Sequence, residues 1–231
     1  MKTKIIATIG PSSLGKEVIK QLIENGMNMI RINTSYGNED QYKTILKNLA
    51  ESDPLSKVQK MLDIKNEKIL SFCETNKMDF IAVSFAESRE QILNIKERFQ
   101  DCKIISKIES VKGAENYDEI IEVSDGVMIA RGDLSRAVTI EKVPVLQKKF
   151  TKIALLKKKF VIAATEMLLS MTENPYPTNA EASDVANAVF DKVDAVMLSE
   201  ETAIGKYPVD SVIMMRKIIV ESEKFLEEEK N

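Results

Sequence analysis

The sequence predicts a (β/α)8 TIM barrel, an α/β fold formed as one domain by residues 1–231. Short, near-continuous apolar runs rich in Val and Ile alternate with helical patterns, which is typical of parallel strands joined by helices. Eight such units fit a chain of 231 residues with almost no insertion, as a closed barrel requires. An open doubly wound sheet is the competing fold, but it gives no special role to the number eight.

The eight predicted strands follow one another at regular intervals along the whole chain. They are Lys4–Ile9, Met29–Ile32, Val58–Ile64, Phe80–Phe85, Lys103–Ile108, Gly126–Ala130, Phe160–Thr165 and Ala195–Ser199. The clearest helical patterns between them are Lys16–Asn25, Glu39–Glu51, Glu67–Asn76, Ser88–Phe99, Val145–Lys158, Asn179–Asp191 and Pro208–Glu228. No linker, repeat or low-complexity tract interrupts this order.

Composition excludes several classes of function. A net charge of -3 gives no reason to expect nucleic acid or a membrane surface as partner. The N-terminal apolar stretch is too short for a signal peptide, and no run reaches membrane-spanning length. Cys73 and Cys102 show neither CxxC nor zinc spacing, so a reducing cytoplasm is the expected location. The absence of histidine excludes Ser-His-Asp, Cys-His and His-ligated metal sites.

The residues that follow the predicted strands are mostly polar, and barrel enzymes bind their ligands at the carboxyl ends of the strands. In strand order, these residues are Pro11 and Ser12; Arg31, Asn33 and Ser35; Asp63 and Lys65; Ser84; Lys107 and Glu109; Arg131 and Asp133; Thr165 and Glu166; Ser199 and Glu201. Any one of them is equally well explained as a solvated rim residue. The whole set of cations, carboxylates and hydroxyls predicts a ligand site.

Glu109 and Asp133 supply the hard oxygen ligands that suit Mg²⁺ or Mn²⁺. The alternative is that each caps the helix that follows it. Lys107 lies two residues before Glu109 and therefore on the same face of the strand. Beside a metal its ammonium group could stabilise an enolate oxygen; otherwise it is a salt-bridge partner.

Two further features point to anions. The RGDL turn opens a short helix, so the backbone N–H groups of Gly132 and Asp133 could bind a carboxylate, unless this is an ordinary glycine turn. Arg31 suits a phosphate, with a salt bridge to Asp63 as the alternative. The segment GPSSLGKE, residues 10–17, nearly matches a phosphate-binding P-loop. Glu17 replaces the required hydroxyl and Pro11 removes a donor, so we do not expect a P-loop.

Taken together, the segments resemble the pyruvate kinase family over nearly the whole chain. The matching blocks are TKIIATIGPSS, GMNMIRINTSYG, LDIK, IAVSF, KIES, DGVMIARGDL, EKVPVLQKKF, ATEMLLSM, NPYPTNAEASDVANAV and DAVMLSEETAIGKYPV. The resemblance implies roles for particular residues. It implies that Lys107 stabilises the enolate, that Glu109 and Asp133 hold the divalent metal, that Thr165 lies beside the pyruvyl group and that Arg31 contacts the phosphoryl group. The resemblance implies that substrate lies along Ala130, Arg131, Gly132 and Asp133, and that Asn33, Ser35 and Asp63 are K⁺ ligands.

The departures from the family concern the nucleotide. The family's lid domain follows the aspartate matched by Asp63, but here LDIK continues directly into the next unit. The family's C-terminal domain is also expected to be absent, and Tyr36 replaces a histidine. We therefore expect the site for metal and enolpyruvate to be retained and the nucleotide site to be eroded.

Three functions follow from these observations. The first is a metal-dependent enzyme acting on phosphoenolpyruvate, pyruvate or a related 2-oxo acid through an enolate, with lyase- or decarboxylase-type chemistry favoured over phosphotransfer. The second is pyruvate kinase itself, and the third is a non-catalytic barrel that acts as a binding or scaffold protein. A homodimer formed through Pro175–Ala188 is also expected, because this segment resembles one that pairs the family's barrels.

Overall fold

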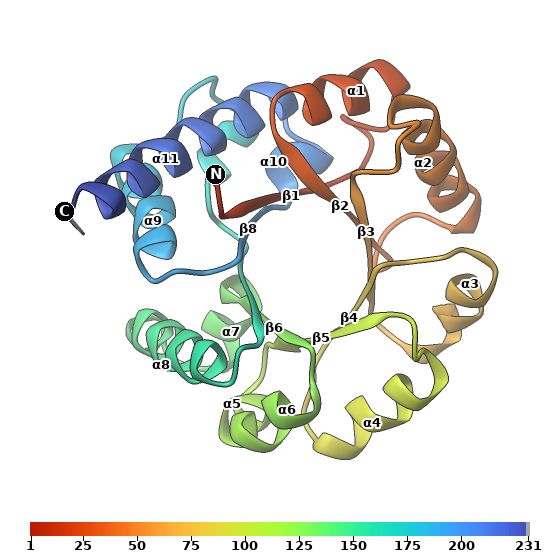
Figure 1. Ribbon diagram of the computed structural model, residues 1–231, viewed down its shortest axis with the longest axis vertical. Helices are drawn as coiled ribbons and strands as arrows, with labels where there is room; N and C mark the ends of the chain where they lie inside the picture. The colour runs from red at the N-terminus through yellow and green to blue at the C-terminus, as the bar shows by residue number, and fades with distance from the viewer. Residues whose placement is uncertain (230–231) are drawn as a thin grey trace. The chain divides into compact units, whose positions relative to one another are not determined.

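The computed structural model describes residues 1–229 and confirms the predicted fold class. Eight strands, hydrogen-bonded in the order β1 to β8, form a closed barrel in which helices connect the strands (Figure 1). The strands are β1 (Lys4–Thr8), β2 (Met27–Asn33), β3 (Gln59–Ile64), β4 (Phe80–Val83), β5 (Lys103–Ile108), β6 (Gly126–Ala130), β7 (Phe160–Ala164) and β8 (Ala195–Leu198). Every predicted strand is present, and no end differs from its prediction by more than two residues.

Helices follow the strands, and the seven predicted ones are all found. The α-helices are α1 (Lys16–Glu24), α2 (Glu39–Ser52), α3 (Leu70–Thr75), α4 (Arg89–Arg98), α5 (Val111–Glu115), α6 (Tyr117–Val123), α7 (Arg131–Ala137), α8 (Val143–Leu156), α9 (Asn179–Phe190), α10 (Glu200–Ala203) and α11 (Pro208–Glu228). Short 3-10 turns are η1 (Glu67–Ile69), η2 (Ile140–Lys142) and η3 (Leu169–Thr172). Helices α5, α6 and α10 were not predicted, because each is too short to show a periodic apolar face.

The chain divides into two compact units. Unit 1 contains Met1–Ile32, Tyr36–Gln59 and the chain from Thr165 onward, and unit 2 contains Asn33–Ser35 and Lys60–Ala164. Within unit 1, β1 pairs in parallel with both β2 and β8. Within unit 2, parallel pairing runs without interruption from β3 to β7. The strands of both units are almost wholly buried, as their continuous apolar sequences predict.

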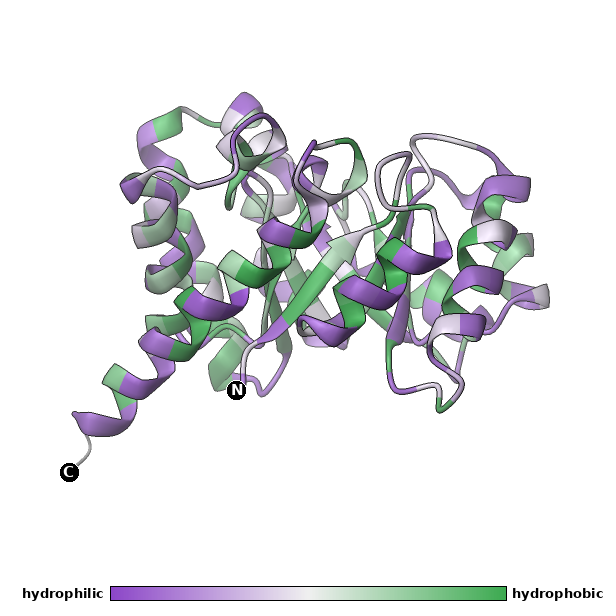
Figure 2. Cartoon of the chain, turned by 90° about the horizontal axis from the view of Figure 1, so that it is seen from above, coloured by the Kyte–Doolittle hydropathy of each residue, from purple (hydrophilic) through white to green (hydrophobic). Residues whose placement is uncertain are grey.

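Helices α9 and α11 of unit 1 lie against each other. Val185 and Val189 of α9 are buried, and the rings of Phe190 and Phe225 lie 5.6 Å apart. This packing accounts for much of the apolar character of α9, and the homodimer stays a prediction. Hydrophobic and hydrophilic residues alternate along α11 in Figure 2. Within residues 1–229, no helix is both long and apolar enough to cross a bilayer.

The connection from β3 to β4 is short. β3 ends at Ile64 and β4 begins at Phe80, with only η1 and α3 between them. The structure thus has no inserted domain after Asp63, as the sequence predicts. The polar carboxyl ends of β3, β4 and β5 follow one another within unit 2, which brings their side chains together.

Candidate active site

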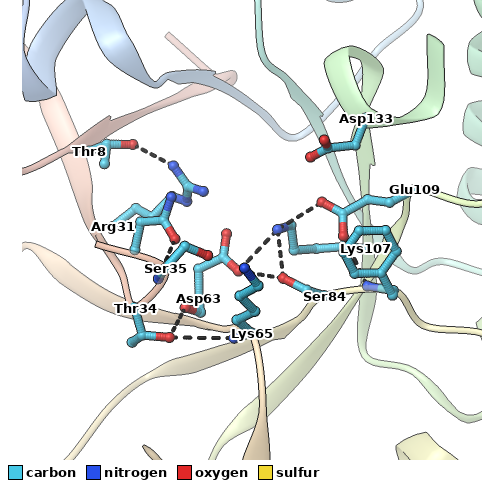
Figure 3. A network of polar contacts seen from close by, with 12 residues as sticks. Thr8, Arg31, Thr34, Ser35, Asp63, Lys65, Ser84, Lys107, Glu109 and Asp133 are labelled. Atoms are coloured by element: carbon cyan, nitrogen blue, oxygen red, sulfur yellow. Dashed lines mark hydrogen bonds and ion pairs between the residues drawn. The ribbon is translucent and has the colours of Figure 1, made fainter. Parts of the chain in front are cut away.

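The centre of the unit 2 site is the ammonium group of Lys107. Its Nζ lies 2.8 Å from Oε1 of Glu109, 3.1 Å from Oδ1 of Asp63 and 2.9 Å from Oγ of Ser84 (Figure 3). Lys107 and Glu109 share a strand face because they are two residues apart at the end of β5. Asp63 and Ser84 come from the corresponding ends of β3 and β4. The three N–H donors of Lys107 therefore each have an acceptor.

Ser84 joins the members of this network. Its hydroxyl accepts from Lys107 and donates to Oδ1 of Asp63 at 3.2 Å. The other carboxylate is fixed by backbone, since the Phe85 N–H donates to Oε2 of Glu109 at 2.9 Å. Glu109 is not the cap of the helix that follows, because the Ser110 hydroxyl accepts from the Gly113 N–H and caps α5. The alternative role considered for Glu109 is therefore wrong.

The unit 2 network is buried and has an excess of negative charge. Asp63, Glu109 and Lys107 are 1, 2 and 6% exposed. Burial raises the pKa of Glu109, and the neighbouring Lys107 ammonium and the Phe85 N–H oppose that rise. Two buried carboxylates around one ammonium leave one negative charge unbalanced, so a further cation beside them would be electrostatically favourable.

Asp133 and the RGDL segment lie at the end of β6, the neighbour of β5. The segment forms α7, which begins at Arg131 and has Ala130 as its N-cap, so the predicted short helix is confirmed. Oδ1 of Asp133 lies 3.2 Å from the guanidinium of Arg136, whose side chain is 83% exposed. Asp133 is in the first turn of α7 rather than at its cap, so the capping role considered for it is also wrong.

The residues expected to bind K⁺ meet in unit 2. The Ser35 N–H donates to Oδ1 of Asn33 at 3.1 Å. Between them, Thr34 donates to the Asp63 carbonyl through its N–H at 3.0 Å and its hydroxyl at 2.8 Å. The turn after β2 is thereby fastened to the end of β3 (Figure 3). Thr34 was not among the predicted site residues.

Arg31 and Thr165 belong to unit 1. Arg31 is 6% exposed, and its Nη1 donates to the Thr8 hydroxyl at 3.0 Å. Thr8 in turn donates to the Leu198 carbonyl at 2.9 Å, so a hydroxyl at the end of β1 orients the guanidinium. Thr165 follows β7 with a φ of 69°. The fully buried Glu201, whose role the sequence did not reveal, binds the same loop through the Leu168 N–H at 3.0 Å.

The segment that resembles a P-loop is closed upon itself. The Gly10 N–H donates to the Ser13 hydroxyl at 3.1 Å, and the Ser13 N–H donates back to the Gly10 carbonyl at 2.9 Å. The Ser12 N–H donates to the Ala203 carbonyl at 2.9 Å. Backbone donors that would have to face a phosphate are thus used within the fold, in agreement with the rejection of a P-loop.

The donor set fits a divalent metal of the kind that keeps water and substrate oxygens in its shell. Within the described part of the chain, no three or more His, Cys, Asp or Glu side chains are grouped so that they could hold a metal ion. Mg²⁺, however, is commonly held by one or two carboxylates together with water and substrate. Glu109 and Asp133, at the ends of the neighbouring strands β5 and β6, would supply two such carboxylates.

Comparison with known proteins identifies the family. The pyruvate kinase barrel-domain family model matches residues 1–69 and 54–212, in two segments that meet around β3. A pyruvate kinase of Thermococcus litoralis is 34% identical over 335 aligned positions, covering 98% of this chain and 70% of the relative. Since 335 exceeds the 231 residues of this chain by 104, at least that many positions of the relative have no counterpart here.

Other relatives match over shorter segments. A pyruvate kinase of Thermotoga maritima is 46% identical over 154 residues, covering 65% of this chain and 33% of the relative. One of Clostridium perfringens is 48% identical over 160 residues, covering 67% of this chain and 34% of the relative. This chain thus spans about a third of the length of these two relatives in the matched segments. The family model and the Thermococcus litoralis relative both cover most of the chain, which therefore belongs to the pyruvate kinase family.

Proposed function

We propose that this chain carries out pyruvate kinase chemistry, the transfer of a phosphoryl group between phosphoenolpyruvate and ADP. The observation that carries the proposal is the buried Lys107 ammonium, held by Asp63, Ser84 and Glu109 at the ends of neighbouring strands. The names of the relatives support phosphotransfer over the lyase- or decarboxylase-type chemistry favoured from the sequence.

Lys107 is proposed to stabilise the enolate. When the bond between phosphorus and the enol oxygen breaks, the electron pair stays on that oxygen, and an adjacent ammonium lowers the energy of the charge. Lys107 must then release one of its present acceptors. Ser84 is the neutral acceptor of the three, so its hydrogen bond costs least to exchange. Addition of a proton to the methylene carbon completes the formation of pyruvate.

The carboxylates are proposed to hold the metal. Glu109 and Asp133 would be its protein ligands, and a bound Mg²⁺ or Mn²⁺ would polarise the oxygens of the substrate. Asp63 would keep Lys107 aligned, and K⁺ is expected beside Asn33, Ser35 and Asp63. Arg31 at the phosphoryl group and Thr165 beside the pyruvyl group are likewise proposed from the family resemblance.

A second candidate is enolate chemistry without transfer to ADP, acting on pyruvate or another 2-oxo acid. The direct connection from Ile64 to Phe80 favours it, because no inserted domain is available there to close over a nucleotide. This candidate uses the same Lys107, Glu109 and Asp133. The two candidates differ in whether a phosphoryl group is transferred to ADP.

Two assays on one protein preparation distinguish the candidates. Pyruvate formation from phosphoenolpyruvate and ADP measures phosphotransfer, and Mg²⁺-dependent exchange of the pyruvate methyl protons in deuterated water measures enolate formation. Lys107→Gln should abolish both, whereas Lys112→Gln, an exposed lysine on α5, should leave both unchanged. Exchange without phosphotransfer supports the second candidate. If wild-type protein shows neither reaction, both are wrong and a binding or scaffold role follows.

A further inference from the structure

The loop after β7 has an unfavourable backbone. Thr165 and Glu166 are consecutive non-glycine residues with φ values of 69° and 54°. Side chains with a Cβ avoid this left-handed region, because the Cβ approaches the following carbonyl oxygen. Two such residues in succession persist only where the surrounding structure fixes them. The next two residues, Met167 and Leu168, are completely buried.

Glu201 is bonded to this loop. It lies in α10, is completely buried, and accepts from the Leu168 N–H through Oε1 at 3.0 Å. Its Oε2 accepts from the Ser199 N–H at 2.7 Å. One carboxylate thus joins the loop after β7 to the end of β8. All of these residues belong to unit 1.

Burial of this carboxylate is costly. Loss of water raises the pKa of Glu201, and the hydrogen bonds from Leu168 and Ser199 counteract that rise. An amide or an apolar side chain would avoid the cost of a buried charge. Only a carboxylate offers two oxygens that both accept, one for each loop. A glutamate at position 201 therefore offsets the cost of its burial by connecting the loop after β7 to the end of β8.

The Ser199 hydroxyl lies beside this connection. Its Oγ is buried and, among the described residues, has no hydrogen-bond partner. The Ser199 backbone is held in an unusual conformation, with φ of -105° and ψ of -95°. Glu201 thus contacts Ser199 directly, and it contacts the loop that begins at Thr165 through Leu168.

We propose that Glu201 is a positioning residue that fixes Thr165 and Ser199 for the substrate through its bonds to Leu168 and Ser199. The role of Thr165 and Ser199 toward the substrate rests on the proposed function, whereas the bonding of the loop by Glu201 does not depend on any activity. Glu201 itself need not touch the reacting atoms, because it acts through the backbone.

Glu201→Gln is the decisive variant, since it keeps the size of the side chain but replaces one acceptor oxygen by a donor. Amide hydrogen exchange of Leu168 and Ser199 should become at least about tenfold faster for one or both, while Ile6 in the core of unit 1 stays unchanged. In kinetics with phosphoenolpyruvate, kcat should fall about tenfold or more and KM should change less than about threefold. Glu200→Gln, on the exposed face of the same helix, is the matched control.

The outcomes separate the two proposals. Wild-type protein without activity would contradict the proposed function, yet the exchange measurement would still test the loop. Unchanged exchange at Leu168 and Ser199 in Glu201→Gln would overturn the positioning role, as would unchanged kcat in an active enzyme. If Glu201→Gln does not fold, Glu201→Asp keeps both acceptors but withdraws them by one methylene. Wild-type exchange and kcat in that variant would equally overturn it.

Discussion

The carboxylate of Asp133 pairs with Arg136, three residues further along α7. Because the Arg136 side chain is 83% exposed, this ion pair contributes little and a divalent metal can displace it. Asp133 thus combines an accessible carboxylate with a fixed position in the first turn of a helix. Glu109, by contrast, is buried and already bonded to Lys107 and Phe85.

Asp133→Ala should weaken the binding of Mn²⁺ in the presence of oxalate by at least about tenfold, because one of two proposed protein ligands is lost. The fold should remain, since Asp133 is partly exposed and contributes little to the core. Titration calorimetry measures the binding, and Asp101→Ala, at an exposed turn before β5, is the control. Equal Mn²⁺ affinity in the wild-type, Asp133→Ala and Asp101→Ala proteins would show that Asp133 is not a ligand of the metal.

The two cysteines should be unreactive in the folded protein. Burial raises the pKa of Cys73 to about 11 and that of Cys102 to about 12. The thiolate is the nucleophile, so at pH 8 only about one thiol in a thousand or fewer is reactive, against roughly a quarter in unfolded chain. Alkylation by iodoacetamide, followed by mass spectrometry, should be at least about a hundredfold slower than in urea. Similar rates for Cys102 in the two conditions would contradict this expectation.

The loop from β1 to α1 approaches α10 too closely for a side chain. A Cβ at Gly10 would lie 2.6 Å from the Ala203 carbonyl oxygen and 2.9 Å from the Ala203 Cβ. At Gly15, five residues later, a Cβ would meet nothing within 4 Å. The same chemical change therefore has different consequences at the two ends of one loop.

Gly10→Ala should lower the free energy of unfolding by about 1–3 kcal/mol, because backbone atoms must move to admit the methyl group. Gly15→Ala should change it by less than about 1 kcal/mol. Urea unfolding followed by circular dichroism measures both. A Gly10→Ala protein as stable as Gly15→Ala would show that α10 can shift freely away from this loop.

Strands and strand-end residues were predictable because both follow from local patterns. Lys107 and Glu109 had to share a face, as the alternation of side chains along a strand requires. The partners of the hydroxyl groups were not predictable. Thr8 donates to the carbonyl of Leu198, 190 positions away, and no local pattern indicates such a contact. The conformation of Thr165 was also hidden, because tertiary contacts rather than local preference determine it.

The short connection between β3 and β4 bears on the proposed transfer to ADP. Transfer to ADP benefits from closure over the nucleotide, which excludes water and aligns the reacting groups. We therefore expect this chain to form pyruvate from phosphoenolpyruvate and ADP at least about a hundredfold more slowly than the roughly 10 per second of a typical enzyme. A coupled assay of pyruvate formation measures this rate. An ordinary rate would show that closure by an inserted domain is dispensable.

The division into two units has a consequence for synthesis on the ribosome. Apart from Asn33–Ser35, unit 2 is one continuous stretch that is complete at Ala164. In unit 1, by contrast, β1 pairs with β8, which is synthesised much later. The residues just before β1 also depend on Glu223 of α11, which accepts the Lys2 and Thr3 N–H groups. Chains emerge from their N-terminus, and contacts between distant residues form late. Nascent chains stalled once Ala164 has left the exit tunnel should resist protease over β3 to β7 while β1 is still cut. The ends of β3, β4 and β5, with Lys107 among them, would then be assembled before β1 has paired with β8.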